Sequence, residues 1–295
     1  MRPSGVVDVG SNTIRLLVAR IDDGCVEPVL TRKFRVGLGR DIEETGAIPD
    51  GRIDEAADAV AQLFRLGRAE GAGVRVLVTA PGRQAGNATD LLAALRKATG
   101  HEPEVLSREE EGRLAFLGAV AAAPPSSPLV AAVDLGGAST EVAIGRPTGD
   151  VAWVRSFDVG ALRLTTRVLA EEKPTLRTLA RARATVAEEL AALTPPFAGE
   201  ARAVGGCARA LRNVVGAALG ASELTEAVDV LARLTHDEIA DEYDVRPDRA
   251  ALLVAAAIVL TEVQARLVVP LAVVDGGVRE GALLDDAADA EERVA

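Results

Sequence analysis

The sequence predicts an α/β protein built from two units of similar size. The chain has 295 residues, about twice the length of a typical domain. Runs of β-forming residues alternate with segments of helical periodicity. One unusual phrase also occurs twice, as VVDVGSNTIRLLVARI near the start and as LVAAVDLGGASTEVAIG in the middle. The repeat indicates one α/β unit that was duplicated and then diverged.

Composition favours well-packed domains and opposes broad binding of polyanions. Apolar residues make up 48% of the chain and aromatic residues only 2%, so the cores are expected to consist of Ala, Val and Leu. The net charge of −11 disfavours attraction to nucleic acid or to acidic membranes, so neither is expected as a partner. An anionic substrate must therefore be bound locally, by backbone N–H groups, a few arginines and a bound cation.

The chain is expected to be a soluble cytoplasmic protein. MRPSGVVDVG leads almost directly into a strand, with no space for a secretion signal. The longest apolar run, AALLVAAAIVL, is shorter than the roughly 20 residues that span a bilayer. Cys25 and Cys207 lie far apart without a CxxC pair, so a disulfide framework or a zinc site is not indicated. The oligomeric state stays open, with a homodimer as one option.

The first unit begins with a hairpin, followed by RKFRVGLGRDIEETGAIPDG, which is expected to be a loop. GRIDEAADAVAQLFRLGRAEG has apolar residues at helical spacing and is predicted to be an amphipathic helix. VRVLVT (74–79) is predicted as a buried strand, APGRQAG as a loop and NATDLLAALRKATG as a helix that Gly100 ends. In open α/β sheets, ligands collect at the carboxyl ends of such strands.

A capping box marks the start of the next helix, in PEVLSREEEGRLAFLGAV. Ser107 and Glu110 have the required spacing, and Glu111 is left free for chemistry. The proline-rich segment AAAPPSSP after this helix is the best linker. We therefore expect domains at 1–123 and 124–295, with a last helix, about 281–295, that packs back on the first domain.

The second unit begins with the repeated hairpin and continues with VAWVRSFDVG as a further strand. A mostly helical region follows, which two more strand-glycine turns interrupt at Gly205-Gly206 and Gly276-Gly277.

The two hairpin turns are the strongest candidates for a binding site. Each follows an aspartate, Asp8 or Asp134, at the end of a predicted strand. A single turn of this kind is most often only a hairpin tip, because Gly, Ser and Asn suit tight turns. Two copies favour a phosphate held between the domains, since small residues allow close approach of backbone donors. The cradle residues are Gly10, Ser11 and Asn12 in the first turn and Gly136, Gly137 and Ser139 in the second.

Several ordered motifs together resemble the exopolyphosphatase and guanosine pentaphosphate phosphohydrolase (Ppx/GppA) family, within the actin-like ATPase superfamily. The matching segments are VVDVGSNTIRLLV, TAPGRQAGNATDLL, VLSREEEGRLAFLGAV, VDLGGASTEVAIG, SFDVGALRLT, VGGCARAL and VVDGGVREG. The resemblance covers nearly the whole chain. It implies two actin-like (ribonuclease H-like) domains with the active site in the cleft between them.

The resemblance also implies residue roles. Glu111 would be the general base that takes a proton from the attacking water, and Arg83 would grip the phosphate. Asp134 and Glu141, with Asp8 opposite, would hold Mg²⁺, with Mn²⁺ as the alternative. The plainer alternatives are a solvated carboxylate at a helix start for Glu111, a surface arginine for Arg83, an exposed strand residue for Glu141, and aspartates that only cap their turns.

Other matching residues are weaker candidates, and some positions depart from the family pattern. Gly160 with Arg163, Arg209 and Arg279 are candidates for a wider channel. Ala138 replaces the third glycine of the second turn, and Pro81 and Gly82 precede Arg83 where the family has other residues. The chain also lacks the extra C-terminal domains of longer relatives, which favours short substrates.

The function implied by the resemblance is hydrolysis of the terminal phosphate of inorganic polyphosphate by in-line attack of water. Guanosine pentaphosphate is the alternative substrate. Two other classes stay open, a small-molecule kinase of the same superfamily and a sensor that binds polyphosphate or nucleotide without turnover.

Overall fold

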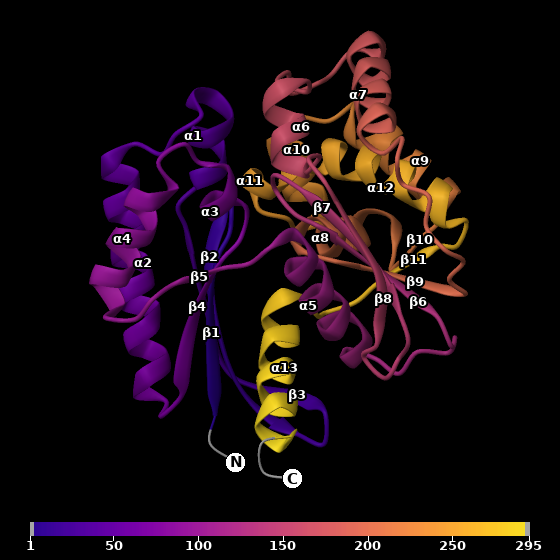
Figure 1. Ribbon diagram of the computed structural model, residues 1–295. Helices are drawn as coiled ribbons and strands as arrows, with labels where there is room; N and C mark the ends of the chain where they lie inside the picture. Colours follow the sequence, from indigo (N-terminus) through magenta and orange to yellow (C-terminus); the bar gives the residue numbers. More distant parts are fainter. Residues whose placement is uncertain (1–2, 293–295) are drawn as a thin grey trace.

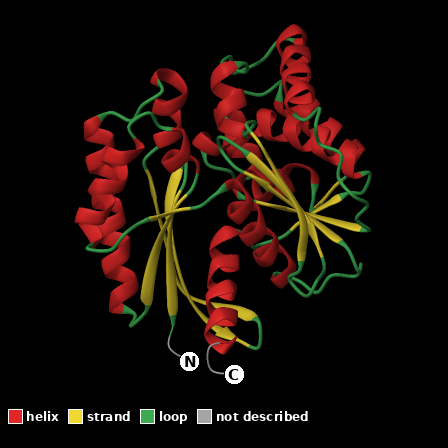
Figure 2. Cartoon of the chain, in the orientation of Figure 1, coloured by secondary structure: helices red, strands yellow, loops and turns green. Residues whose placement is uncertain are grey.

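A computed structural model describes residues 3–292, and two mixed β-sheets lie side by side in it (Figure 1; Figure 2). The first sheet has the strand order β3-β2-β1-β4-β5. Its strands are β1 (Ser4–Val9), β2 (Thr13–Asp22), β3 (Cys25–Arg35), β4 (Gly73–Val78) and β5 (Glu104–Val105). β1 pairs antiparallel with β2 and parallel with β4, as the predicted hairpin requires.

The second sheet has the strand order β10-β11-β9-β6-β7-β8. Its strands are β6 (Val130–Leu135), β7 (Thr140–Gly145), β8 (Val151–Phe157), β9 (Glu200–Val204), β10 (Ala218–Leu219) and β11 (Leu271–Val273). β6 and β7 form the second predicted hairpin, and β9 runs parallel to β6. Strands β8-β7-β6-β9-β11 therefore match β3-β2-β1-β4-β5 in order and direction, which supports duplication.

The helices of the first unit correct two sequence predictions. They are α1 (Leu38–Thr45), α2 (Asp50–Ala69), α3 (Ala80–Gln84) and α4 (Ala88–Thr99). The expected loop after the first hairpin instead contains the end of β3 and the whole of α1. β3 was missed because its many polar and charged side chains are largely exposed on an edge strand, without the alternation of a half-buried strand. The expected loop APGRQAG contains α3, since a proline in the first turn is compatible with a helix start.

Most of the remaining helices belong to the second unit. They are α6 (Ala161–Arg167), α7 (Leu176–Glu189), α8 (Gly206–Val215), α9 (Ala221–Leu231), α10 (His236–Tyr243), α11 (Pro247–Ala250) and α12 (Leu253–Leu267). In the described chain, one helical stretch, Pro247–Leu267, is long and apolar enough to cross a membrane. Its length exceeds the sequence estimate, but most of it is buried against α6, α7, α8 and α9, as expected for a core helix.

Two long helices, α5 (Arg108–Ala121) and α13 (Val278–Glu292), lie between the sheets (Figure 1). α5 packs on β6, β7 and β8 of the second sheet, and α13 packs on β1 and β2 of the first. The helices touch at glycines, since a Cβ on Gly118 or Gly281 would collide with the backbone of Gly277 or Leu114. The domain boundary at residues 123 and 124 stays a prediction, and residues 293–295 of the predicted last helix lie outside the described residues.

Both ends of α5 are fixed, which positions its first turn. The predicted capping box is confirmed, because Ser107 Oγ accepts from the Glu110 N–H and the Glu110 side chain accepts from the Ser107 N–H. At the other end, the buried guanidinium of Arg202 donates to the carbonyl oxygens of Ala119 and Ala123 over 2.7 and 2.6 Å. The contact to Ala119 satisfies a carbonyl group of the last turn, and the contact to Ala123 fixes the chain just after the helix. Glu111 is thereby held at a defined place, one residue beyond the capping glutamate.

Candidate functional site

The two hairpin turns face each other across a cleft between the units. Its lining includes the predicted residues Asp8, Gly10, Ser11, Asn12, Glu111, Asp134, Gly136, Gly137 and Ser139. The structure therefore brings nine of the predicted site residues into one site. Arg83 and Glu141 are not among the lining residues.

Each turn accepts hydrogen bonds from the start of a helix. In the first unit, the Gly39 N–H at the start of α1 donates to the Ser11 carbonyl oxygen over 2.6 Å. In the second, the Ala161 and Arg163 N–H groups of α6 donate to the carbonyl oxygens of Gly136 and Gly137, both over 3.0 Å. The carbonyl groups of both turns are thus turned away toward helix N-termini. This arrangement suits a site for an anion, which must be met by donors rather than by carbonyl oxygens.

Close contact explains the glycines better than unusual backbone angles do. A Cβ on Gly137 would lie 3.2 Å from the Ser11 Cβ of the opposite turn, so the turns nearly touch. A Cβ on Gly160 would lie 2.5 Å from the backbone of Gly137, so Gly160 allows the start of α6 to contact the turn. Among described residues, positive φ outside glycine occurs at Asp23, Asp244 and Val268. Ala138 therefore fits its turn without a left-handed backbone.

Burial raises the pKa of three carboxyl groups in and beside the cleft. It raises the pKa of Glu111 to about 7, although Arg83 nearby acts in the opposite direction. Burial also raises the pKa of Asp134 to about 6, and it raises the pKa of Glu141 well above its ordinary value. The carboxylates of Glu111 and Asp134 add to the effect on Glu141. A cluster of acids that resist ionisation together is a recognised feature of functional sites.

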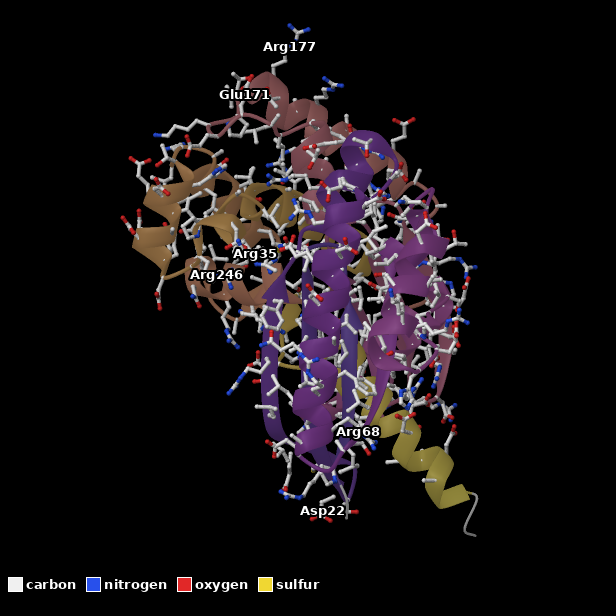
Figure 3. The ribbon with its side chains drawn as sticks, turned by 90° about the vertical axis from the view of Figure 1, so that its left-hand side faces the viewer. Asp22, Arg35, Arg68, Glu171, Arg177 and Arg246 are labelled. Carbon is white, nitrogen blue, oxygen red and sulfur yellow. The ribbon has the colours of Figure 1, made fainter. Side chains whose placement is uncertain are left out.

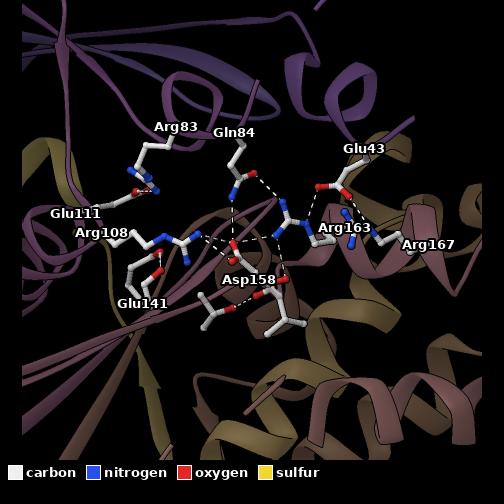
Figure 4. A network of polar contacts seen from close by, with 12 residues as sticks. Glu43, Arg83, Gln84, Arg108, Glu111, Glu141, Asp158, Arg163 and Arg167 are labelled. Atoms are coloured by element: carbon white, nitrogen blue, oxygen red, sulfur yellow. Dashed lines mark hydrogen bonds and ion pairs between the residues drawn. The ribbon is translucent and has the colours of Figure 1, made fainter. Parts of the chain in front are cut away.

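Arg83 is bound to the predicted base instead of facing the cleft. Its Nη2 donates to Glu111 Oε2 over 2.6 Å (Figure 4). Its Nη1 donates to the Leu106 carbonyl oxygen over 2.7 Å. Its Nε is buried and has no partner. Arg83 therefore orients Glu111 in this structure, and its role in gripping phosphate stays a prediction.

The carboxylates fit a cation only if a ligand completes its coordination. Residues 3–292 contain no group of three or more His, Cys, Asp or Glu side chains arranged to hold a metal ion. Asp8 and Asp134 line the cleft, whereas Glu141 is 1% exposed and accepts a hydrogen bond from Ser156 Oγ over 2.7 Å. Mg²⁺ commonly binds one or two carboxylates together with waters and substrate phosphates. The donors present fit a Mg²⁺ that binds with a phosphate ligand.

A network of polar contacts joins the two units at one rim of the cleft (Figure 4). Glu43 of α1 accepts from Arg163 and Arg167 of α6, each over 2.6 Å, although its side chain is only 2% exposed. Arg163 also donates to Gln84 of α3 over 2.7 Å and to Asp158 over 3.1 Å. Every nitrogen of the Arg163 guanidinium is thus engaged, so this weaker candidate joins the units rather than facing the cleft.

The other two weaker candidates lie in a second hollow next to the cleft. Arg209 and Arg279 line it together with Asp8, Arg15 and Asp134. Burial lowers the pKa of both arginines, and the nearby charge of Arg15 adds to the effect. Their ion pairs, to Asp275 and Glu280, are long at 3.8 and 3.5 Å. Three arginines and, with Glu280, three carboxylates thus line the hollow, and Arg209 and Arg279 are the weakly paired arginines.

Several lining residues were not singled out as site residues by the sequence analysis, among them Arg15, Thr79, Cys207 and Arg249. Arg15 is the cross-strand partner of Asp8, and its Nη2 binds Asp8 Oδ2 over 2.9 Å. Strand alternation would have identified it, because Arg15 lies two residues beyond the turn on the same hairpin. Thr79, Cys207 and Arg249 also line the cleft, and Arg249 comes from a four-residue helix with no motif of its own.

Comparisons with known proteins agree with this geometry. Residues 17–290 match the model of the Ppx/GppA phosphatase family. The chain is 30% identical over 299 residues to exopolyphosphatase 1 of Mycobacterium tuberculosis, which covers 95% of this chain and 87% of the relative. It is 32% identical over 163 residues to a guanosine-5'-triphosphate,3'-diphosphate pyrophosphatase of Vibrio vulnificus, which covers 51% of this chain and 32% of the relative.

A solved structure extends the agreement to the fold. The crystal structure of the Aquifex aeolicus member of the Ppx/GppA family has a TM-score of 0.84 and 26% identity, and the match covers 97% of this chain and 98% of that one. The predicted architecture of two actin-like domains is thereby confirmed. With the family model matching nearly the whole sequence and the motif residues gathered in one cleft, the chain belongs to the Ppx/GppA phosphatase family.

Proposed function

We propose that the protein is an exopolyphosphatase that removes the terminal phosphate of inorganic polyphosphate, with short chains as substrates. The observation that carries the proposal is the meeting of both glycine turns and Glu111 in one cleft. Relatives named exopolyphosphatase that align with most of the chain support the choice of substrate. Guanosine pentaphosphate is the second candidate, and the Vibrio vulnificus relative supports it over about half of the chain.

The cleft residues would have two roles in phosphoryl transfer, binding of the phosphoryl group and activation of the attacking water. Backbone donors of the two turns would hold the terminal phosphoryl group, and Glu111 would accept a proton from a water placed in line with the bond that breaks. The water oxygen bonds to the terminal phosphorus, the bridging P–O bond breaks, and the electron pair leaves with the shortened chain. The products are orthophosphate and a chain with one fewer unit.

The raised pKa of Glu111 suits this role. A base with a pKa of about 7 is partly ionised at neutral pH and strong enough to take a proton from the attacking water as its oxygen bonds to phosphorus. Arg83 would keep its carboxylate oriented. Mg²⁺, or Mn²⁺ in its place, would bind at Asp134 of the second hairpin, with Glu141 beside it and Asp8 opposite. The substrate phosphate and waters would complete its coordination, and the cation would neutralise charge on the phosphoryl oxygens. A cytoplasmic location and a homodimer stay predictions.

Phosphate release from polyphosphate with Mg²⁺ and no acceptor tests the function. A hydrolase releases orthophosphate under these conditions. A kinase releases none until nucleotide and acceptor are added, and a sensor binds polyphosphate without release. A parallel assay with guanosine pentaphosphate separates the two candidate substrates. Absence of release from either compound, with binding retained, would contradict the proposed activity.

A further inference from the structure

Six polar side chains from both units meet at one rim of the cleft, in a cluster that we name the clasp (Figure 4). Its members are Glu43, Gln84, Arg108, Asp158, Arg163 and Arg167. Arg163 lies at the centre, since its guanidinium donates to side chains of three other members. The side chains of Arg163 and Glu43 are only 10% and 2% exposed, so solvent and salt screen their ion pair little. The centre of the clasp is therefore a buried contact between the units and not a surface ion pair.

Each glycine turn is connected to the clasp through a helix. α1 carries Glu43, and the Gly39 N–H at the start of the same helix donates to the Ser11 carbonyl oxygen of the first turn. α6 carries Arg163, whose own backbone N–H donates to the Gly137 carbonyl oxygen of the second turn. The Glu43–Arg163 ion pair of 2.6 Å thus joins the two helices that hold the turns. Loss of this ion pair would free the turns to move relative to each other.

The proposed base is connected to the clasp from two sides. Gln84 follows Arg83 on α3, and Arg83 donates to Glu111 over 2.6 Å. Arg108 lies at the start of α5, three residues before Glu111, and donates to both carboxylate oxygens of Asp158 over 2.9 Å. Gln84 also donates to Asp158, over 3.2 Å. A displacement of α3 or of the start of α5 would therefore move Glu111 relative to the turns.

We propose that the clasp positions Glu111 against the phosphoryl group held between the turns, with Arg163 as the central positioning residue. The inference rests on the proposed function, because it concerns how that site is assembled. The six clasp residues are not among those that line the cleft in the described chain, so they act through the groups that do. In-line attack requires the base, the water and the phosphorus in a fixed geometry, and a misplacement of about 1 Å can cost about a hundredfold in rate. Loss of the clasp should therefore slow the chemical step more than it weakens binding.

Arg163→Gln tests the proposal in the full-length protein. The forked contacts to three partners are lost, so kcat for phosphate release should fall roughly tenfold to a hundredfold, while KM changes less than about threefold. Gln84→Leu breaks the contacts of α3 with the clasp without changing the net charge, and should lower kcat about threefold to tenfold. Arg52→Gln is the matched control. Arg52 also binds two carboxylates, but both of them, Asp41 and Glu55, belong to the first unit.

A role confined to stability would give a different result. In that case Arg163→Gln would lower the unfolding temperature, but the folded variant would keep the kcat of Arg52→Gln, and the inference would be overturned. Gln84→Leu decides the same question if Arg163→Gln does not fold, because it leaves the Glu43–Arg163 ion pair in place.

A distance measurement tests the clasp without any substrate. Figure 3 shows Arg68 of α2 and Arg177 of α7, one exposed residue in each unit, near opposite ends of the molecule. Nitroxide labels attached after Arg68→Cys and Arg177→Cys, with the exposed Cys25 replaced by serine, report how far apart the units lie. Arg163→Gln should broaden the distribution of distances between the labels, whereas Arg52→Gln should not. If the wild-type protein hydrolyses no polyphosphate, the proposed function fails, and an unchanged distribution in Arg163→Gln would overturn the clasp as well.

Discussion

The two hairpins share one register but differ in charge at one position. In the first, Asp8 pairs across the strands with Arg15, and in the second, Asp134 pairs with Glu141. The first aspartate is neutralised by an ion pair of 2.9 Å. The second faces another acid, and burial raises the pKa of both. The second hairpin is therefore the side that needs a proton or a cation, which is why we place the proposed Mg²⁺ there.

The largest expected effect comes from the carboxylate between the hairpins. Glu111→Gln keeps the shape of the side chain but removes the base, so phosphate release should fall about a hundredfold to ten-thousandfold. Polyphosphate binding, measured by calorimetry, should change little. Glu109→Gln is the matched control, because this neighbouring glutamate is exposed. Near-normal turnover by Glu111→Gln would remove this residue from the mechanism.

Neutralising the cross-strand residue should have opposite effects in the two hairpins. Arg15→Gln leaves Asp8, whose side chain is 4% exposed, without its ion pair, and should lower the free energy of unfolding by roughly 1–3 kcal/mol. Glu141→Gln removes an acid that is costly to ionise, and should raise the free energy of unfolding of the metal-free protein at pH 8. Denaturant unfolding measures both changes.

The gain from Glu141→Gln should depend on pH. In the unfolded chain, Glu141 ionises near its ordinary pKa of 4.5. In the folded protein, Glu141 keeps its proton to a higher pH. The folded state therefore binds more protons, and its stability falls as pH rises above about 4.5. The advantage of the glutamine variant should vanish near pH 4 and grow toward pH 8. A pH-independent difference, or a loss like that of Arg15→Gln, would show that the hairpins are electrostatically alike.

Equivalent glycines in the two turns should also tolerate alanine differently. A Cβ on Gly136 would lie 2.9 Å from the Ser139 carbonyl oxygen, whereas a Cβ on Gly10 would lie 3.4 Å from that of Thr13. Gly136→Ala should cost about 1–3 kcal/mol of stability, and Gly10→Ala less than about 1 kcal/mol. Thermal unfolding of the two variants side by side measures the difference. Equal losses would indicate that the second turn can relax as easily as the first.

The smallest expected effect is a shift in the pH profile. Because Glu111 must be ionised to act as a base, activity should rise with pH through about 7. A cation beside Asp134 and Glu141 favours nearby carboxylates in their charged form, so raising the Mg²⁺ concentration should move the midpoint to lower pH. In Glu141→Gln this shift should be weaker. If the pH midpoint of activity does not change with the Mg²⁺ concentration in either protein, the proposal of a cation at the second hairpin is contradicted.

Local patterns predicted much of the fold. Both hairpins, the capping box at Ser107, the strand β4 and the helix end at Gly100 follow from residue spacing and from turn chemistry, which act over a few residues. Of the missed elements, β3 and α3 show no clear apolar period, and α1 is only eight residues long, with Leu38 and Ile42 as its apolar side chains. Their structure depends on partners elsewhere, such as the contact of Gly39 with Ser11.

The sequence by itself determined that two acidic glycine turns exist and that a glutamate follows the capping box, because these features depend on neighbours in the chain. Only the tertiary structure decided which arginine meets which acid. Arg83 binds Glu111, Arg15 binds Asp8 and Arg163 joins the units, while Arg249 donates to Cys207. Long side chains reach their ion-pair partners only after distant elements have packed together. Sequence patterns that act over a few residues do not show how those elements pack.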